Sequence, residues 1–203
     1  MNITVIGVGF VGLVTSVYFA SHGHDVVCYD KDIKKIELAK NGESHFFEIG
    51  LEKKIKTVLG KTLKFTDDCD LALNASDIIF VCVGTPTVSG KIDLSALMSI
   101  SKNIAFSLID SSDAKTIVIK STVVPGTASD VLVPIIEKHS GKKEGVDFLI
   151  ASNPEFLREG TAVWDMFNPD RIIVGSNDPS ISEKILDLYP ENSKNKFAVS
   201  LST

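Results

Sequence analysis

The stretch Ile3-Thr4-Val5-Ile6-Gly7-Val8-Gly9-Phe10-Val11-Gly12 joins an apolar, β-branched run to a segment with helical spacing. Runs rich in Val and Ile favour strands, and glycine permits the tight turn that a strand-to-helix junction needs. Strand-like and helix-like segments then alternate along all 203 residues. This alternation predicts an α/β fold with a doubly wound, mostly parallel sheet of Rossmann-type topology, which fills residues 1–203 as one domain.

Several of the predicted strands are continuously apolar, which is typical of parallel strands covered by helices on both faces. The predicted strands span residues 3–6, 26–29, 63–65, 78–83, 116–119, 148–151, 171–174 and 197–199. The predicted helices carry an apolar stripe at helical spacing and span residues 11–22, 33–40, 93–109 and 127–139. Asp93 is the expected N-cap of the third helix, and we expect Thr127 to cap the fourth rather than to bind a ligand. Residues 88–91 and 141–146 are predicted to be short connections.

Composition and charge exclude several classes of protein. Hydrophobic residues make up 44% of the chain and charged residues 23%, which are ordinary values for a folded globular domain. The net charge of −5 provides no basic surface for a nucleic acid or an anionic membrane. No run approaches the ~20 apolar residues of a membrane span. Glycines interrupt the apolar residues 1–20, and no Lys or Arg precedes them, so a signal peptide is disfavoured.

The three cysteines, Cys28, Cys69 and Cys82, form no CxxC pair and no cluster with histidine. Cys28 and Cys82 lie inside apolar, strand-like runs, where cysteine usually acts as a small core residue. This usage predicts no bound metal, no disulfide framework and a cytoplasmic location.

The glycines of residues 7–12 favour a dinucleotide site. Gly7 permits the tight turn, Gly9 lets the backbone approach a pyrophosphate, and Gly12 lets helix and strand pack closely. The N-terminus of the following helix adds free N–H groups and its dipole. A glycine-rich turn that serves only packing is the alternative. The preceding strand, the following helix and an acidic residue downstream all favour the dinucleotide.

That acidic residue is Asp30, eighteen positions after Gly12, at the end of the second predicted strand. A carboxylate there accepts hydrogen bonds from the ribose hydroxyls and repels a 2′-phosphate, so NAD is favoured over NADP. Lys31, Lys34 and Lys35 follow closely and weaken this argument, because a lysine can pair with a 2′-phosphate. The other interpretation of these lysines is a solvated helix face.

Three unusual segments follow predicted strands, at the sheet edge where ligands of open α/β sheets bind. They are residues 83–87 (VGTPT), 120–127 (KSTVVPGT) and 152–160 (SNPEFLREG). Hydroxyl groups at strand ends also serve as ordinary turn residues. Glu155 and Glu159, four residues apart, form either a solvated pair or the general base of a reaction.

These segments together resemble the UDP-glucose/GDP-mannose dehydrogenase family. The resemblance runs through GVGFVG, Asp30, VGTPT, STVVPGT, NPEFLREGTA and NPDRIIVG in the family's order. It implies two successive NAD-dependent oxidations that convert the C6 alcohol of a nucleotide sugar, through an aldehyde, to a carboxylate. UDP-glucose, oxidised to UDP-glucuronate, is the expected substrate. GDP-mannose and UDP-N-acetylmannosamine are the alternatives.

The resemblance also assigns residues to roles. For NAD it implies Gly7, Val8, Gly9, Phe10, Val11, Gly12, Asp30, Lys35, Val83, Gly84, Thr85, Pro86, Thr87, Ser121, Thr122, Val123 and Glu159. For the nucleotide sugar it implies Glu155, Phe156, Leu157, Arg158 and Glu159. Glu155 matches the family's acid/base glutamate. Thr122 and Glu159 match positions that the family associates with a water near the reacting carbon.

The chain departs from the family pattern in one large respect. The family's catalytic cysteine, in a Gly-Gly-Ser-Cys-Phe-like segment, has no counterpart among the three cysteines. The family's lysine and asparagine, carried on a helix after the last predicted strand, are expected beyond Thr203, as are its central helix and its C-terminal nucleotide-sugar domain. Without a thiolate, aldehyde oxidation lacks a nucleophile, so we expect this chain alone to bind NAD but to be inactive. Intact family members associate through the central helix, so we expect a homodimer or larger assembly of the full-length protein and a monomer of the fragment.

Two other interpretations remain from the sequence. One is a stand-alone NAD-binding or regulatory module. The other is an unrelated two-domain dehydrogenase that shares only the Rossmann half, which NPEFLREG disfavours.

Overall fold

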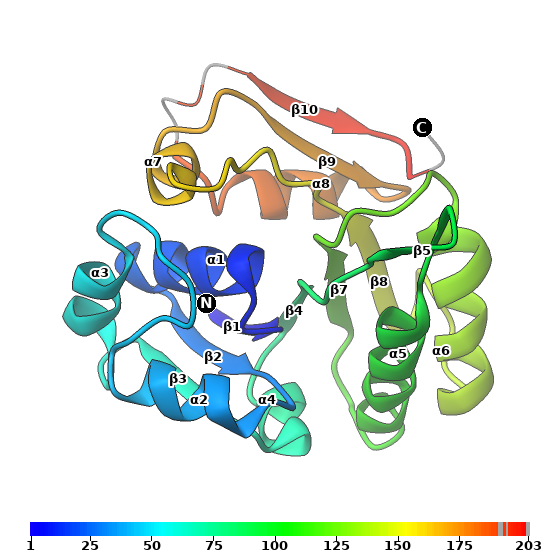
Figure 1. The fold of residues 1–203 in the computed structure, drawn as a ribbon. Helices are drawn as coiled ribbons and strands as arrows, with labels where there is room; N and C mark the ends of the chain where they lie inside the picture. The colour runs from blue at the N-terminus through cyan, green and yellow to red at the C-terminus, as the bar shows by residue number, and fades with distance from the viewer. Residues whose placement is uncertain (191–192, 194, 202–203) are drawn as a thin grey trace.

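The computed structural model describes residues 1–190, 193 and 195–201, and its centre is an eight-stranded sheet (Figure 1). The strands are β1 (Asn2–Ile6), β2 (Asp25–Tyr29), β3 (Leu63–Thr66), β4 (Ile78–Val81), β7 (Lys115–Ile119), β8 (Phe148–Ser152), β9 (Ile172–Ser176) and β10 (Lys196–Val199). Their order is β10-β9-β8-β7-β4-β1-β2-β3, and β8–β9 is the antiparallel pair. The six strands from β3 to β8 follow the dinucleotide-binding order of a Rossmann fold. The predicted fold class is confirmed, and each predicted strand lies within two residues of an observed one.

Eight α-helices and one π-helical segment connect the described strands. They are α1 (Phe10–Ser21), α2 (Ile33–Lys40), α3 (Leu51–Val58), α4 (Cys69–Asn74), α5 (Ser95–Leu108), η1 (Thr127–Leu132), α6 (Val133–Ser140), α7 (Ala162–Phe167) and α8 (Pro179–Leu186). Helices α3, α4, α7 and α8 were not predicted from the sequence. Of these, α4 and α7 have only six residues each and so show fewer than two turns of helical periodicity. Thr203, beyond which a further helix is expected, lies outside the described residues.

Two predicted helix caps differ from the structure. Thr127 does not cap a helix: its hydroxyl donates to the Val124 carbonyl at 2.8 Å, and it begins η1 after Gly126, whose φ is +86°. The predicted helix 127–139 therefore starts with a π-helical segment. Helix α5 begins at Ser95 rather than at residue 93. The Asp93 carboxylate nonetheless accepts the Ser95 N–H at 2.8 Å, so it serves the first turn from one position before the N-cap.

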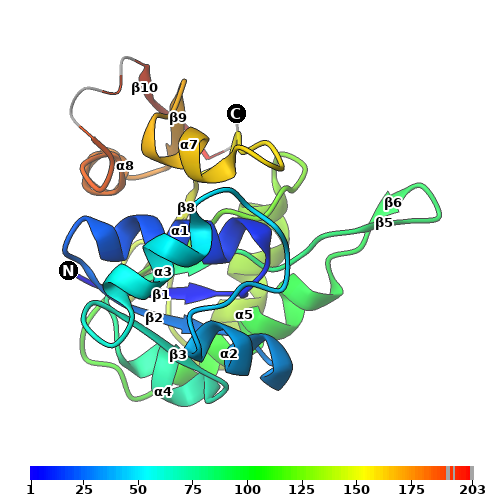
Figure 2. The same ribbon diagram turned by 60° about the vertical axis from the view of Figure 1, so that its left-hand side comes forward.

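The predicted connection at residues 88–91 is part of a β-hairpin. Strands β5 (Thr87–Val88) and β6 (Lys91–Ile92) pair in antiparallel register, and Figure 2 shows the hairpin projecting from the body of the molecule. Ser89 and Gly90 have φ angles of +51° and +78°, the left-handed conformation of the tightest hairpin turns.

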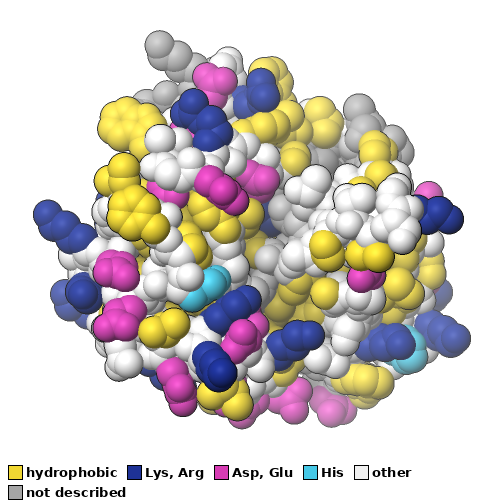
Figure 3. Space-filling model, in the orientation of Figure 1, with side chains coloured by type: hydrophobic (Ala, Val, Ile, Leu, Met, Phe, Trp, Pro, Cys, Tyr) yellow, Lys and Arg dark blue, Asp and Glu magenta, His cyan; other side chains and the backbone are white. Residues whose placement is uncertain are grey.

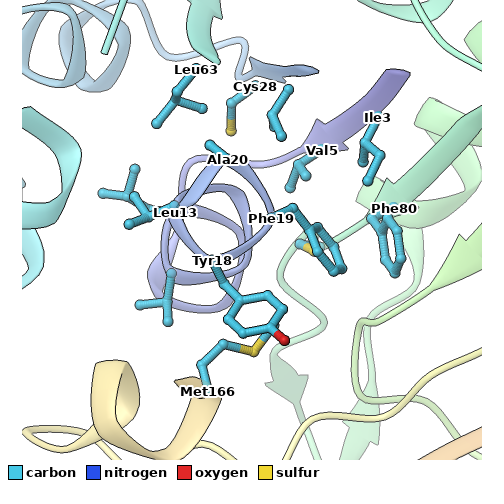
Figure 4. Packing of buried hydrophobic residues seen from close by; sticks show 14 of the residues in the cluster. Ile3, Val5, Leu13, Tyr18, Phe19, Ala20, Cys28, Leu63, Phe80 and Met166 are labelled. Carbon is cyan, nitrogen blue, oxygen red and sulfur yellow. The ribbon is translucent and has the colours of Figure 1, made fainter. Parts of the chain in front are cut away.

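Alternate residues of each central strand enter separate hydrophobic clusters. Ile78 and Phe80 of β4 belong to the cluster around α1, α3, α7 and α8, whereas Ile79 and Val81 belong to the cluster around α5 and α6. Successive side chains of a strand point to opposite faces, so helices cover both faces of the sheet. Figure 4 shows the first cluster around α1, where the Phe19 and Phe80 rings lie 4.8 Å apart.

The turn between β1 and α1 is set by close backbone packing. Gly7 has a φ of +104°, and a Cβ there would lie 2.8 Å from the Cys82 carbonyl oxygen. A Cβ at Gly12 would lie 1.8 Å from the Gly7 carbonyl oxygen. A Cβ at Gly9 would meet no atom within 4 Å. Two of the three glycines are therefore required by packing, while Gly9 borders open space.

Substitution of these glycines tests which of them the backbone packing requires. Gly12→Ala forces a Cβ against rigid backbone, so we expect it to lower the free energy of unfolding by about 3 kcal/mol or more. Gly9→Ala, at a φ of −82° and with open space, should change it by less than about 1 kcal/mol. Urea denaturation of both variants measures the difference. Equal stabilities would contradict this account of the turn.

Candidate functional site

The carboxyl ends of β1, β4, β7 and β8 meet at one edge of the sheet, and the N-terminus of α1 starts there. Gly9 is the N-cap of α1 and no side chain caps the helix, so its first N–H groups remain available to an anion. With the open space beside Gly9, the geometry fits a dinucleotide pyrophosphate. Figure 3 shows a recess near the centre of the face that presents this edge, with charges of both signs around it.

Asp30 lies beside the glycine loop (residues 7–12), as the sequence predicts. Its Oδ2 accepts the Val8 N–H at 2.8 Å, and its Oδ1 accepts the Asp32 N–H at 2.9 Å. Lys35 Nζ lies 4.0 Å from Oδ2, so this lysine is paired with the carboxylate. Lys31 and Lys34 are exposed. The carboxylate is thus oriented by two backbone N–H groups at the end of β2, where it can accept hydrogen bonds from a ribose.

The structure brings the segments 83–87 and 121–123 together. The Ser121 hydroxyl donates to the Val83 carbonyl at 2.6 Å, and the Thr85 hydroxyl donates to the Thr122 carbonyl at 2.6 Å. The Thr122 side chain is exposed. These bonds fix the two strand-end segments against each other beside the glycine loop, because β4 pairs with both β1 and β7.

The loop 153–160 leaves β8 and reaches α7 without helical structure. The spacing of Glu155 and Glu159 therefore does not place them on one face of a helix. Glu155 accepts the Leu157 N–H at 2.6 Å. Arg158 is bound to Asp165, with its Nη2 2.6 Å and its Nε 3.1 Å from the two carboxylate oxygens. This pairing lowers the pKa of Asp165, while Glu159 is exposed.

A buried polar cluster that was not predicted from the sequence lies at the start of this loop. Asn153 Oδ1 is 3.1 Å from Lys120 Nζ and accepts the Tyr189 hydroxyl at 2.5 Å. Lys120 Nζ also lies 3.2 Å from the Tyr189 hydroxyl, and the Asn153 amide donates to the Ile173 carbonyl at 2.8 Å. Lys120 was detectable as a charge directly after the apolar residues 117–119 (IVI) of β7. Tyr189 was not, because no local pattern places it there.

Burial controls the titration of this cluster. Lys120 is 3% exposed, and burial lowers its pKa to about 8, an effect that nearby Cys82 and Glu155 partly offset. Burial raises the pKa of the Cys82 thiol to about 12, with Lys120 acting in the opposite direction. Cys82 and Cys28 are both core residues, as predicted. At neutral pH Cys82 is a protonated thiol and therefore a poor nucleophile.

A cavity of about 960 Å³ lies between the loop 153–160, α7 and the segment before β9. Lys120, Glu155 and Arg158 contribute to its lining. Its volume is that of a site for a small organic molecule. Among the described residues, no group of three or more His, Cys, Asp or Glu side chains is placed to hold a metal ion. No helix in the described part of the chain has the length and hydropathy to cross a membrane.

Comparison with known proteins identifies the family. Residues 1–193 match the profile described as "UDP-glucose/GDP-mannose dehydrogenase family, NAD binding domain". The chain belongs to this family. The resemblance found in the sequence is confirmed, and NAD is the cofactor.

Individual relatives carry two different substrate names. A GDP-mannose 6-dehydrogenase of Pseudomonas syringae pv. tomato is 42% identical over 194 residues, which are 94% of this chain and 44% of that protein. A UDP-glucose 6-dehydrogenase of Rhizobium meliloti is also 42% identical over 194 residues, 93% of this chain and 43% of that protein. The structure of a ternary complex of GDP-mannose dehydrogenase from Pseudomonas aeruginosa superposes with a TM-score of 0.96 at 36% identity, covering 100% of this chain and 47% of that one. The chain thus spans about half the length of these relatives.

The buried lysine should give stability a specific pH dependence. Because the pKa of Lys120 falls from 10.5 to about 8 on folding, the unfolded chain binds more protons between these pH values. The contribution of Lys120 to the free energy of unfolding therefore increases as pH rises. From pH 7.5 to pH 10, the free energy of unfolding of wild type should rise by about 2–3 kcal/mol relative to that of Lys120→Met. Urea denaturation at both pH values measures it.

The matched control is Lys64→Met, which makes the same replacement at an exposed position of β3. Its difference from wild type should stay constant over this pH range. Parallel pH profiles for wild type and Lys120→Met would show that burial does not perturb Lys120.

Proposed function

We propose that this chain is the NAD-binding part of a nucleotide-sugar 6-dehydrogenase. Such an enzyme oxidises the sugar C6 alcohol to a carboxylate in two successive hydride transfers. The convergence of the loop 153–160, with Glu155, on the edge where α1 begins carries the proposal. The loop contributes Glu155 to the lining of a cavity of suitable size, and Lys120, which directly precedes Ser121, lines the same cavity.

In this proposal each part of the edge has its own task. NAD, when bound, accepts the hydride. The N–H groups of α1 and Gly9 hold the pyrophosphate, and Asp30 accepts hydrogen bonds from the adenosine ribose. Residues 83–87 and 121–123 line the path toward the reacting carbon. Glu155 accepts the alcohol proton, and Thr122 and Glu159 position a water there.

The nature of the sugar is the open choice within this proposal. The TPT and FLREG forms favour UDP-glucose, with UDP-glucuronate as the product. GDP-mannose is supported equally by relatives of the same identity. UDP-N-acetylmannosamine is the third candidate. A structure named as a UDP-D-ManNAc dehydrogenase of Pyrococcus horikoshii matches at 31% identity and a TM-score of 0.90.

The remaining elements of turnover are proposed to lie in other parts of the full-length protein. These are the cysteine nucleophile, the family's lysine and asparagine, the central helix and the rest of the nucleotide-sugar pocket. The chain of residues 1–203 is then inactive by itself while retaining its cofactor site, and the central helix makes the full-length protein a homodimer or larger assembly.

The stoichiometry of NADH formation tests the reaction. The complete reading frame should form two NADH for each UDP-glucose or GDP-mannose consumed, and residues 1–203 alone should form none. Parallel assays with UDP-glucose, GDP-mannose and UDP-N-acetylmannosamine, followed by absorbance at the NADH band, identify the sugar. One NADH per sugar would exclude oxidation to the acid. A full-length protein that oxidises none of the three would overturn the proposed function.

Cofactor preference tests the role of Asp30. Asp30→Ser removes the carboxylate that repels a 2′-phosphate and a hydrogen-bond acceptor for the ribose. The ratio of kcat/KM for NAD over NADP should therefore fall about 10–100-fold. Asp32→Ser is the control, because Asp32 is an exposed carboxylate two residues away that caps α2 through the Lys34 N–H. An unchanged ratio in Asp30→Ser, or an equal fall in the control, would refute the assignment.

A further inference from the structure

Glu48 is a buried carboxylate outside both the glycine loop and the loop 153–160. It is 5% exposed, and no salt bridge to it is present in the described part of the structure. Its Oε2 accepts the Gly160 N–H at 2.9 Å, and its Oε1 accepts the Val163 N–H at 3.4 Å. Burying a carboxylate is costly unless hydrogen bonds compensate it. These two bonds, to residues more than 110 positions away in sequence, therefore compensate the burial of the carboxylate.

The contact fixes the far end of the loop 153–160. Gly160 ends this loop with a φ of +85°, and Thr161, the N-cap of α7, offers no side-chain cap. Glu48, from another part of the chain, supplies an acceptor for the Val163 N–H in the first turn of α7. The near end of the loop is fixed by Asn153 in the buried cluster with Lys120. The loop that carries Glu155 is thus held at both ends, and Glu48 is one of the two anchors.

The segment that contains Glu48 also touches the glycine loop. The Phe46 ring packs edge-on against the Phe10 ring, with centroids 5.5 Å apart, and Phe10 directly follows Gly9. His45, in the same segment, has its pKa lowered by burial and by Lys35, and raised in part by Asp30. Figure 2 shows this segment, between α2 and α3, running toward α7. Residues 45–48 therefore connect the glycine loop to the loop 153–160.

We propose that Glu48 is a positioning residue that couples the glycine loop to the loop 153–160. In this proposal a cofactor on the glycine loop fixes Phe10 and, through it, Phe46. Glu48, two residues after Phe46, then holds Gly160 and so the loop that carries Glu155. This inference rests on the proposed function for the role of Glu155. The contact itself, and its response to NAD, are independent of which sugar is oxidised.

Glutamine is the sharpest replacement because it keeps the size and removes the second acceptor. The amide of Glu48→Gln accepts one N–H and turns its own NH₂ toward the other, which leaves a buried donor unpaired. Glu52→Gln is the matched control. Glu52 is exposed, and its Oε1 accepts the Ser44 N–H at 3.2 Å in the same segment without reaching α7.

Hydrogen exchange of the full-length protein, with and without NAD, tests the coupling. In the wild type NAD should slow exchange of the amides in residues 157–166. In Glu48→Gln these amides should exchange about tenfold faster or more, and NAD should no longer protect them. The Kd for NAD should stay within about threefold, while kcat falls about tenfold or more because Glu155 is misplaced. Glu52→Gln should match the wild type in every readout.

Several results would overturn the coupling. These are no effect of NAD on residues 157–166 in the wild type, unchanged exchange in Glu48→Gln, or equal effects in Glu52→Gln. Faster exchange across the whole sheet would show that Glu48 serves general stability only. Should Glu48→Gln fail to fold, Glu48→Asp is the second test. It retains both acceptor oxygens, so NAD should still slow exchange of the amides in residues 157–166, and loss of this protection would contradict the coupling. A wild type that oxidises no sugar would contradict the proposed function, whereas the exchange data would still test the coupling between the two loops.

Discussion

The approach of α1 to the turn that precedes it constrains the rest of the molecule. A side chain at Gly12 would fall 1.8 Å from the Gly7 carbonyl oxygen, so the helix begins as near to β1 as the backbone permits. This closeness directs the N-terminus of α1 at the sheet edge where β1, β4 and β7 end. The Asp30 carboxylate, which accepts the Val8 N–H, and the segments after β4 and β7 are arranged around that point. A shift of α1 would displace all of these groups together.

Two buried charges hold the loop 153–160, and each is costly by itself. Lys120 loses solvation, which lowers its pKa, and recovers part of that cost through Asn153 and Tyr189. Glu48 recovers its cost through two backbone N–H groups. Buried polar groups with their partners present give a loop one geometry rather than many. An apolar anchor would hold the loop by packing but would not specify where its N–H groups point.

The sequence predicted those features that have a local physical cause. Continuous apolar runs predicted the eight strands of the large sheet, and the glycine spacing predicted the turn before α1 with Asp30 beside it. Helices α4 and α7 were missed because six residues show too little periodicity. Helix α3 was detectable, since Leu51, Ile55 and Val58 are spaced for one buried face. The contacts of Asn153 with Tyr189 and of Glu48 with Gly160 could not be predicted, because they join segments 36 and 112 residues apart and depend on the assembled sheet.

The reversal of strand direction after β8 adds a second unit to one side of the sheet. The six strands from β3 to β8 have the parallel order that leaves a dinucleotide site at their carboxyl ends. The next unit runs back along β9, antiparallel to β8, and returns through α8 to β10. It places Tyr189 against Lys120 at the end of β7, and α7 beside the loop 153–160. The cavity of about 960 Å³ is lined mainly by the loop 153–160 and this added unit, with Lys120 as its contribution from the end of β7.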